Sequence, residues 1–355
     1  MFSILDRYIG KTILNMIAIT LFLLISLSGI IRFIDQLRRV KVDYDAMAAA
    51  LYSVLMIPKD LEVFFPIAAL IGSLIGLGLL ASKSELVVME TAGFSRLHIV
   101  KAVMKTAIPL VLIVMAIGEW VAPTSEQTAR NMRSEKTYGG SLIATQDSIW
   151  AKDGNDYVHI GKVDSDNTIS NIDIFSVSDE GELSVITHAA YATYQNNAWQ
   201  LVQVDKSDLT DPNKVRGTNL LSMQWTSSIT PDKLNIVAQN PESLSASGLY
   251  QYAQYLKSSG QDSTNYQLLF WKKLLKPLSV AVMMLLALSF IFGPLRSVPM
   301  GVRVITGVAV GFIFYIADSL FSQVSIVAGL PPILGAMLTS IVFLAISYYL
   351  FNKKS

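Results

Sequence analysis

Basic residues gather where long apolar segments end, and they are the side chains in this chain best suited to bind a ligand. Arg32 lies in the last turns of the first apolar segment, with Arg38 and Arg39 just beyond it. On a helix that continues, Arg32, Gln36 and Arg39 share one face because their spacing is i, i+4, i+7. Lys59 opens the second apolar segment directly after a proline.

Two more arginines, Arg130 and Arg133, are spaced i, i+3 where the third apolar segment is expected to end in a helix. An arginine inside hydrocarbon costs about 2.5–3.5 kcal/mol at mid-depth and less near the interface. One interpretation is that each basic side chain reaches up to nearby head groups. The other is that basic residues from three helices hold phosphates, since the arginine fork matches phosphate geometry. Phosphates beside an apolar cavity would indicate a phosphorylated lipid.

Motifs for catalysis are missing from the sequence. There is no GxxxxGK[ST] phosphate loop, nucleophile elbow or HExxH motif. The chain has no cysteine, and its three histidines are too scattered for a histidine-based metal site. Asp318 is the one acid deep in a predicted span, and a proton relay usually needs a chain of such groups. A proton-coupled transporter is therefore the weaker alternative, and Asp318 could instead pair with an arginine.

Membrane-spanning helices are the elements expected to position these residues. The 355 residues are 52% hydrophobic and 15% charged, with a mean hydropathy of +0.45 and a net charge of +1. This composition excludes a disordered chain, a coiled coil, most cytosolic enzymes and a globally basic nucleic-acid binder. A span needs roughly 20 apolar residues. The apolar segments predict six spans, at about 13–34, 61–81, 99–121, 271–293, 302–321 and 329–351.

Pairs of glycines four residues apart occur in two of these spans, Gly72 with Gly76 and Gly307 with Gly311. Such pairs let two helix backbones approach closely in lipid. Glycine is also simply frequent in membrane helices, and the sequence leaves both explanations open.

The middle of the chain has a different pattern, with short β-branched and aromatic runs such as 157–160 and 183–186 between turn clusters. This pattern predicts an all-β sandwich or jelly roll over about 141–238, followed by a helix over 243–259. The fold class is thus an α-helical membrane protein with six transmembrane helices (3+3) and an inserted all-β domain. The predicted domains are 1–135 with spans one to three, 136–265 with the β-domain and its trailing helix, and 266–355 with spans four to six.

A short helix is predicted near 83–93, between spans two and three. Ser82 is expected to be its N-cap and Glu85, three residues later, the second member of a capping box, with Gly93 at its end. Its apolar residues Leu86, Val87 and Met89 could lie on a partner protein or on the bilayer surface. Lysine and arginine in the short loops place this helix and both termini inside, although basic residues at the outer helix ends nearly remove that bias.

Six segments of the sequence are similar to the LptF/LptG permease family of the lipopolysaccharide-export ABC transporter of Gram-negative bacteria. They are LDRYIGK (5–11), SLSGIIRF (26–33), SELVVM (84–89), AIGEWVAP (116–123), YGGSL (138–142) and FGPLRSVPMGVR (292–303). The resemblance covers essentially the whole chain.

The resemblance implies a permease subunit that extracts lipopolysaccharide from the outer leaflet of the inner membrane and passes it to a periplasmic β-jelly-roll bridge. The partners it implies are the paralogous permease LptF, a homodimer of the ATPase LptB, and LptC with its single spanning helix and β-domain. It implies no catalysis and no cofactor in this chain, because ATP and Mg are used by the ATPase. The location it implies is the inner membrane, with cytoplasmic termini and a periplasmic jelly roll.

The resemblance also assigns roles to particular residues. Phe64 and Tyr315 match apolar positions of the lipid cavity, and Glu85 matches the acid that meets the ATPase. The remaining alternative, a membrane scaffold or sensor with a periplasmic binding domain, would need none of these roles. The positions that match the family's phosphate-binding basic residues are Arg32, Arg38, Arg39, Lys59, Arg130 and Arg133.

Overall fold

Two compact units make up the fold of this chain in a computed structural model. The transmembrane unit comprises Met1–Arg38, Ser53–Glu126 and Gln267–Ser355, and the β unit comprises Arg39–Tyr52 and Gln127–Tyr266. The described residues are 4–40, 43–138, 149–165, 167–178, 180–211, 214–227, 229–231, 234, 241–295 and 298–352.

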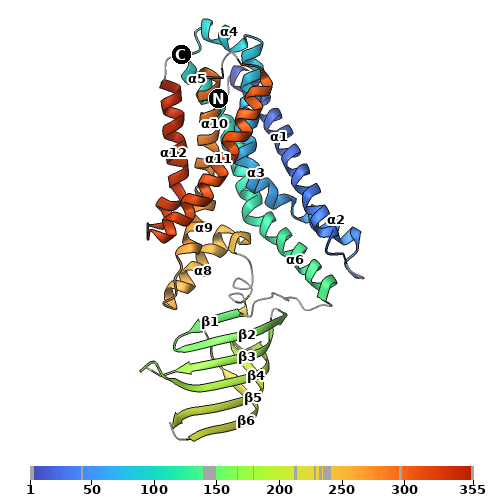
Figure 1. Ribbon diagram of the computed structural model, residues 1–355, viewed down its shortest axis with the longest axis vertical. Helices are drawn as coiled ribbons and strands as arrows, with labels where there is room; N and C mark the ends of the chain where they lie inside the picture. The colour runs from blue at the N-terminus through green and yellow to red at the C-terminus, as the bar shows by residue number, and fades with distance from the viewer. Residues whose placement is uncertain are drawn as a thin grey trace. The chain divides into compact units, whose positions relative to one another are not determined.

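Long apolar helices form most of the transmembrane unit (Figure 1). Within the described residues, five helices are long and apolar enough to cross a membrane, or six if the bent pair α9–α10 is one span. Five of the six predicted spans are thereby confirmed, and the fourth span corresponds to the bent pair. The helices are α1 (Ile4–Leu37), α3 (Ile57–Ser82), α4 (Glu85–Thr91), α5 (Arg96–Ala116), α9 (Thr264–Leu274), α10 (Lys276–Phe292), α11 (Met300–Val327) and α12 (Pro332–Asn352).

The third span differs from its predicted end at 121. The chain stays helical from Arg96 onwards, through the π-helix η1 (Ile117–Val121) and to the end of α6 (Ala122–Tyr138). The apolar pattern stops near 121, but the polar residues after it are compatible with a helix, so hydropathy alone places the end too early.

The fourth span, predicted as one helix over 271–293, is divided at Leu275. Helices α9 and α10 meet there at an angle of 52°. Pro277 lies in the first turn of α10. Proline lacks an N–H group and its ring clashes with the carbonyl four residues back, so it favours the start of a new helix over continuation of the old one.

Glycines bring two helices onto α3. A methyl group added at Gly72 would lie 2.5 Å from Cα of Ile17, so α1 approaches α3 more closely than any side chain would allow. Gly311, on α11, similarly faces Ile67, where an added methyl group would lie 3.0 Å away. The two GxxxG pairs therefore mark close helix contacts, as one of the two explanations predicted.

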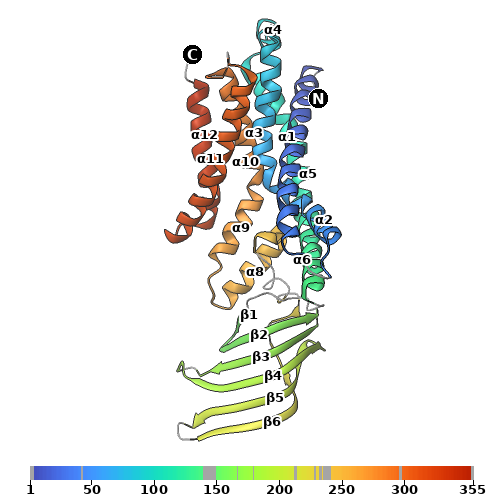
Figure 2. The same ribbon diagram turned by 45° about the vertical axis from the view of Figure 1, so that its right-hand side comes forward.

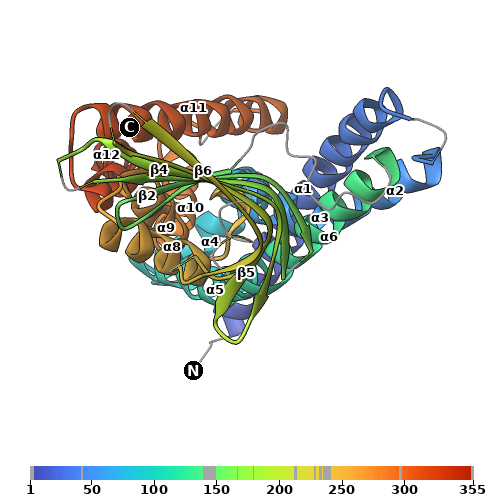
Figure 3. The ribbon, with the colours of Figure 1, turned by 90° about the horizontal axis from the view of Figure 1, so that it is seen from below.

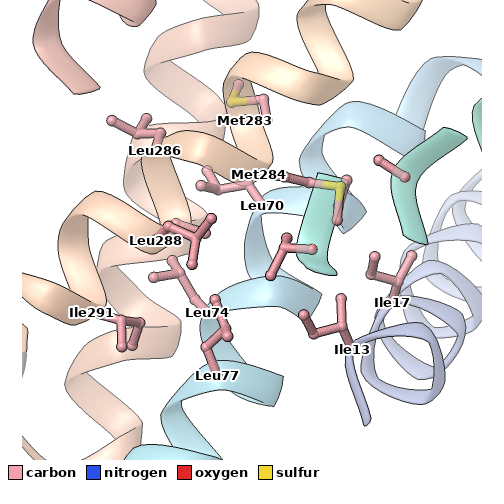
Figure 4. Packing of buried hydrophobic residues seen from close by; sticks show 14 of the residues in the cluster. Ile13, Ile17, Leu70, Leu74, Leu77, Met283, Met284, Leu286, Leu288 and Ile291 are labelled. Atoms are coloured by element: carbon pink, nitrogen blue, oxygen red, sulfur yellow. The ribbon is translucent and has the colours of Figure 1, made fainter. Parts of the chain in front are cut away.

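The apolar core of the transmembrane unit is centred on α3 and α10 (Figure 4). Leu70, Leu74 and Leu77 of α3 are fully buried, as are Met284 and Leu288 of α10. By contrast, only 11% of the most apolar 18-residue stretch of α1 and 17% of that of α11 are buried, against 72% for α3. Helices α1 and α11 therefore present wide apolar faces to whatever surrounds the unit, as lipid or another membrane helix would.

The described strands of the β unit form one six-stranded antiparallel sheet in the order β1 to β6, and its strands curve strongly (Figure 3). This confirms the predicted all-β insertion. The two-residue turn Asn196–Asn197, both with positive φ, connects β4 to β5. The strands are β1 (Ile149–Asp153), β2 (Asp156–Ser165), β3 (Thr168–Val177), β4 (Leu183–Gln195), β5 (Ala198–Asp211) and β6 (Lys214–Trp225).

The two faces of the sheet differ in chemistry. Val158, Ile172 and Leu201 are fully buried on the apolar face, together with Trp199, whose indole Nε1 donates to the carbonyl of Ile229 at 2.7 Å. The alternation of inward apolar and outward polar residues expected of such strands is therefore present.

A trailing helix follows the strands, as predicted for 243–259. The N-cap of helix α8 (Ala246–Ser258) is Ser245, whose Oγ accepts from the backbone N–H of Gly248 at 3.1 Å. The helix ends before Gly260, which has a φ of +67°. The hydroxyl of Tyr255 donates to the carbonyl of Lys152 at 3.2 Å, which ties α8 to β1. The single-turn 3₁₀ helix η2 (Pro241–Ser243) precedes it.

Candidate phosphate-binding and coupling sites

The first turns of α3 carry three charged residues that each contact a different helix. Lys59 pairs with Glu126 of α6 at 2.8 Å. Asp60 accepts two hydrogen bonds from Arg32 of α1, from Nη1 at 2.7 Å and from Nη2 at 2.5 Å. Glu62 forms ion pairs with Lys273 and Lys276, on either side of the α9–α10 junction. An acid is favourable here because Asp60 lies near the positive end of the α3 dipole.

These ion pairs affect how Arg32 and Lys59 would bind a phosphate. The guanidinium of Arg32 has both of its fork nitrogens on Asp60, and the ammonium of Lys59 is on Glu126. A phosphate arriving at either cation must share it with the acid or displace the acid. The acids also hold both cations in fixed positions, which lowers the entropy lost on binding a ligand.

The turn after α1 places Arg38 and Arg39 differently from the expectation. Helix α1 ends at Leu37, so Arg39 does not lie on a helical face with Arg32 and Gln36. That expectation was wrong, because it assumed that the helix continued beyond Leu37. Arg38 and Arg39 are both exposed. Arg38 belongs to the transmembrane unit and Arg39 to the β unit.

The β unit contains a second group of predicted phosphate ligands. The guanidinium carbon of Arg133 lies 4.9 Å from the ring centroid of Tyr52, and Nη1 donates to the Tyr52 hydroxyl at 3.4 Å. Burial raises the pKa of Tyr44, an effect that the positive charges of Arg133 and Arg39 only partly offset. Arg39 and Arg133 therefore lie around the same buried tyrosine, while Arg130, one turn before Arg133 on α6, is half-buried.

The two predicted cavity residues lie on a packed pair of helices. Phe64 is half-buried on α3, and Tyr315 of α11 is 55% exposed. Helices α3 and α11 approach each other at Gly307 and Gly311. The two predicted cavity residues therefore lie on neighbouring helices of the transmembrane unit.

The short helix predicted near 83–93 forms, but its start differs from the prediction. Helix α3 continues to Ser82, whose Oγ donates to the carbonyl of Leu79 at 2.9 Å, so Ser82 cannot be the N-cap of α4. The chain instead turns at Ser84, which has a left-handed φ of 58° and makes no side-chain cap. Gly93, with a φ of +92°, follows the helix as predicted.

The side chains of α4 point in two directions. Leu86 and Met89 are buried in the core of the transmembrane unit, whereas Val87 and Val88 are exposed. The expected outer apolar face of Leu86, Val87 and Met89 is therefore wrong in two of its three members. The reason is that a helix this short, following α3 directly, uses one side to anchor itself.

Glu85 is held in place from α1. Its Oε2 accepts from the hydroxyl of Tyr8 at 2.8 Å, and the glutamate itself is half-buried at the start of α4. This bond connects the first turns of α1 to the short helix. A partner protein that binds Glu85 would therefore contact a carboxylate whose position is already set by α1.

Comparison with known proteins identifies the family. The family model described as lipopolysaccharide export system permease LptF/LptG matches residues 7–353. The chain belongs to the LptF/LptG family. The lipopolysaccharide export system permease protein LptG of Escherichia coli strain K12 is 54% identical over 357 residues, covering 100% of this chain and 99% of the relative. That of Haemophilus influenzae is 47% identical over the same shares.

Several acids of this LptF/LptG chain were not predicted as site residues. Asp60 and Glu62 are close to Lys59 in the sequence, so the order Lys-Asp-Leu-Glu was a usable indication of a charged helix start. Glu126 carries no such indication, because its pairing with Lys59 depends on how α6 packs. Asp318 pairs with Lys272 at 2.5 Å, whereas an arginine was expected, because the α9–α10 bend brings lysines to α11.

A further titratable cluster of the LptF/LptG chain lies on the polar face of the sheet. His159 and His188 contact the two oxygens of Asp173 at 3.0 and 2.7 Å. Burial opposes ionisation of Asp173, but the two histidine hydrogen bonds outweigh it and lower the pKa of this carboxyl. Among the described residues, no group of three or more histidine, aspartate or glutamate side chains is arranged to hold a metal ion.

Proposed function

We propose that this chain is the transmembrane permease subunit of an ABC transporter that extracts lipopolysaccharide from the outer leaflet of the inner membrane. It passes the lipid to a periplasmic β-jelly-roll bridge towards the outer membrane. The observation that carries the proposal is the family match over residues 7–353, which includes both helical parts and the β insertion. The partners in this proposal are the paralogous permease LptF, an LptB homodimer and LptC.

In this proposal the wide apolar faces of α1 and α11 border a lipid cavity shared with LptF. Acyl chains contact Phe64 and Tyr315, and phosphates contact the basic residues. Arg32 and Lys59 are held by Asp60 and Glu126 until a phosphate competes for them. Arginine suits this exchange because its fork binds carboxylate and phosphate in the same bidentate geometry.

The energy for transport comes from a separate protein in this proposal. The chain binds no cofactor of its own, and LptB uses ATP and Mg. Helix α4 is cytoplasmic, as are both termini, and the β unit is periplasmic. LptB pushes on α4 near Glu85, and the bond from Tyr8 transmits that displacement to α1. Because the backbones of α1 and α3 approach each other closely at Ile17 and Gly72, the movement also reaches α3.

The energy source separates this function from a proton-coupled transporter. In vesicles that hold the complete complex, we expect ATP to drive lipopolysaccharide to a soluble jelly-roll acceptor, with no need for a proton gradient. Asp318→Asn should keep at least about half of the release, because Lys272 retains its contact with the Ser322 hydroxyl at 3.0 Å. Release that needs a proton gradient and is abolished in Asp318→Asn would refute the proposal. A complex without any release would favour the scaffold.

A further inference from the structure

The bend between α9 and α10 gathers three lysines beside a single shared carboxylate. Lys272 and Lys273 lie in the last turn of α9, and Lys276 is the first residue of α10. Glu62 of α3 is 3.2 Å from the Lys276 ammonium and 3.6 Å from that of Lys273. Lys272 is occupied separately by Asp318. The bend lies at the end of the transmembrane unit opposite to α4 (Figure 2).

In the ion pairs that the described residues form at this bend, cations outnumber acids. Lys273 and Lys276 together carry two positive charges, and Glu62 supplies one negative charge. The side chains of all three are mostly buried, with exposures of 17%, 24% and 12%. Lys272 and Lys273 both repel the ammonium of Lys276. Two buried cations that share one acid are only partly compensated, and ionisable residues inside membrane spans usually mark functional sites.

Hydrogen-bond donors are also left over. An ammonium group carries three N–H bonds. Within the described chain, Lys276 donates one of them, to Glu62 Oε1, and Lys273 reaches the carbonyl of Gly118 at 3.4 Å. Gly118 lies in the π-helix of the third span, and a methyl group there would be 2.9 Å from Glu62 Cδ. The site is thus built from four segments, α3, η1, α9 and α10, without a side chain at Gly118 to fill it.

We propose that Lys273 and Lys276, with Glu62, form an anion site for the phosphate of a membrane lipid, separate from the six predicted phosphate ligands. A phosphate supplies the missing negative charge and accepts the unused N–H bonds. The anion must carry an acyl tail, because α9 and α10 together form an apolar candidate span, from which a free anion is excluded. Both a phospholipid head group and a lipopolysaccharide phosphate have this chemistry.

The test uses the purified complex in nanodiscs of phosphatidylethanolamine and phosphatidylglycerol, with and without added lipopolysaccharide. Retained lipids are identified by native mass spectrometry. Lys273→Gln with Lys276→Gln should lower the retention of one lipid class by about tenfold, because charged hydrogen bonds are lost. Loss of phosphatidylglycerol identifies a phospholipid site, and loss of lipopolysaccharide places the bend on the export route. Lys273→Arg with Lys276→Arg should restore retention.

A matched control separates this effect from a general loss of charge. Lys101 and Lys105 of α5 are four residues apart, against three for Lys273 and Lys276, and Lys105 pairs with one carboxylate, Asp6, at 2.8 Å. Lys101→Gln with Lys105→Gln should retain lipid as the unmodified complex does. Glu62→Gln should retain at least as much lipid, because the carboxylate that competes with the ligand is neutralised.

Two results would overturn the site. One is unchanged retention of both lipid classes in the Lys273/Lys276 variant. The other is a loss of lipid in Glu62→Gln equal to that in the lysine variant, which would make the three residues a purely structural cluster. This inference goes beyond the proposed function and can fail independently of it. An unmodified complex that never retains lipopolysaccharide contradicts the export function. Retention of phosphatidylglycerol that does not depend on Lys273 and Lys276 contradicts only the site.

Discussion

Arg130→Glu combined with Arg133→Glu is expected to lower the lipopolysaccharide retained by the purified complex by at least about tenfold. The double change replaces two positive charges by two negative ones, which repel phosphates directly. It also removes the guanidinium that lies over the ring of Tyr52, so the group around Tyr44 loses its ordered cation. The measurement is the amount of lipopolysaccharide per complex after purification in detergent.

The control for this experiment reverses the charge of two lysines elsewhere in the β unit, Lys206→Glu with Lys257→Glu, which gives the same change in net charge. Lipopolysaccharide should remain at the level of the unmodified complex. Arg130→Lys with Arg133→Lys should give an intermediate amount, because lysine keeps the charge but not the bidentate fork. Equal lipopolysaccharide in the reversal variant and its control would contradict a phosphate-binding role for these arginines.

Glu85→Lys is expected to reduce co-purification of the ATPase by more than about tenfold. Reversing one partner of a desolvated interface pair leaves the other charge buried beside a like charge, which costs roughly 2–5 kcal/mol or more. The measurement is the ratio of ATPase to permease after affinity purification. An unchanged ratio would contradict a coupling role for Glu85.

The bond from Tyr8 to Glu85 provides the control for that experiment. Tyr8→Phe removes the hydroxyl that donates at 2.8 Å but leaves the carboxylate. The ATPase should therefore stay bound in Tyr8→Phe. If transmission to α1 depends on this bond, ATP hydrolysis should continue while release of lipopolysaccharide falls, which separates docking from coupling.

The helices and the all-β insertion could be predicted because their patterns are local. Apolar length predicts a span, and alternation between turns predicts a strand. The spacing of Gly72 and Gly311 from their partner glycines was also visible in the sequence. Spacing alone left open whether they mark close contacts, and it could not name Ile17 and Ile67 as their neighbours. Pro277 was a usable indication of the α9–α10 break, because proline favours the first turn of a helix.

The partners of the charged residues could not be predicted in the same way. Whether Arg32 binds Asp60 or a ligand depends on how α1 packs against α3. Sequence patterns predict each helix but not the packing between helices. The left-handed turn at Ser84 was missed for a related reason. Serine is a good N-cap in many helices, but here α3 extends into the predicted cap and forces the chain to turn two residues later.

Lipid contact with the transmembrane unit is the central claim, and a photo-crosslinking residue in place of Phe64 tests it most directly. Phe64 is half-buried on α3, while Leu77 on the same helix is fully buried and serves as the control position. In living cells, irradiation should join lipopolysaccharide to the chain at position 64, only when the partner ATPase is active, and not at position 77. A folded protein that yields no lipopolysaccharide adduct at position 64, or one that yields it equally without ATPase activity, would contradict the account.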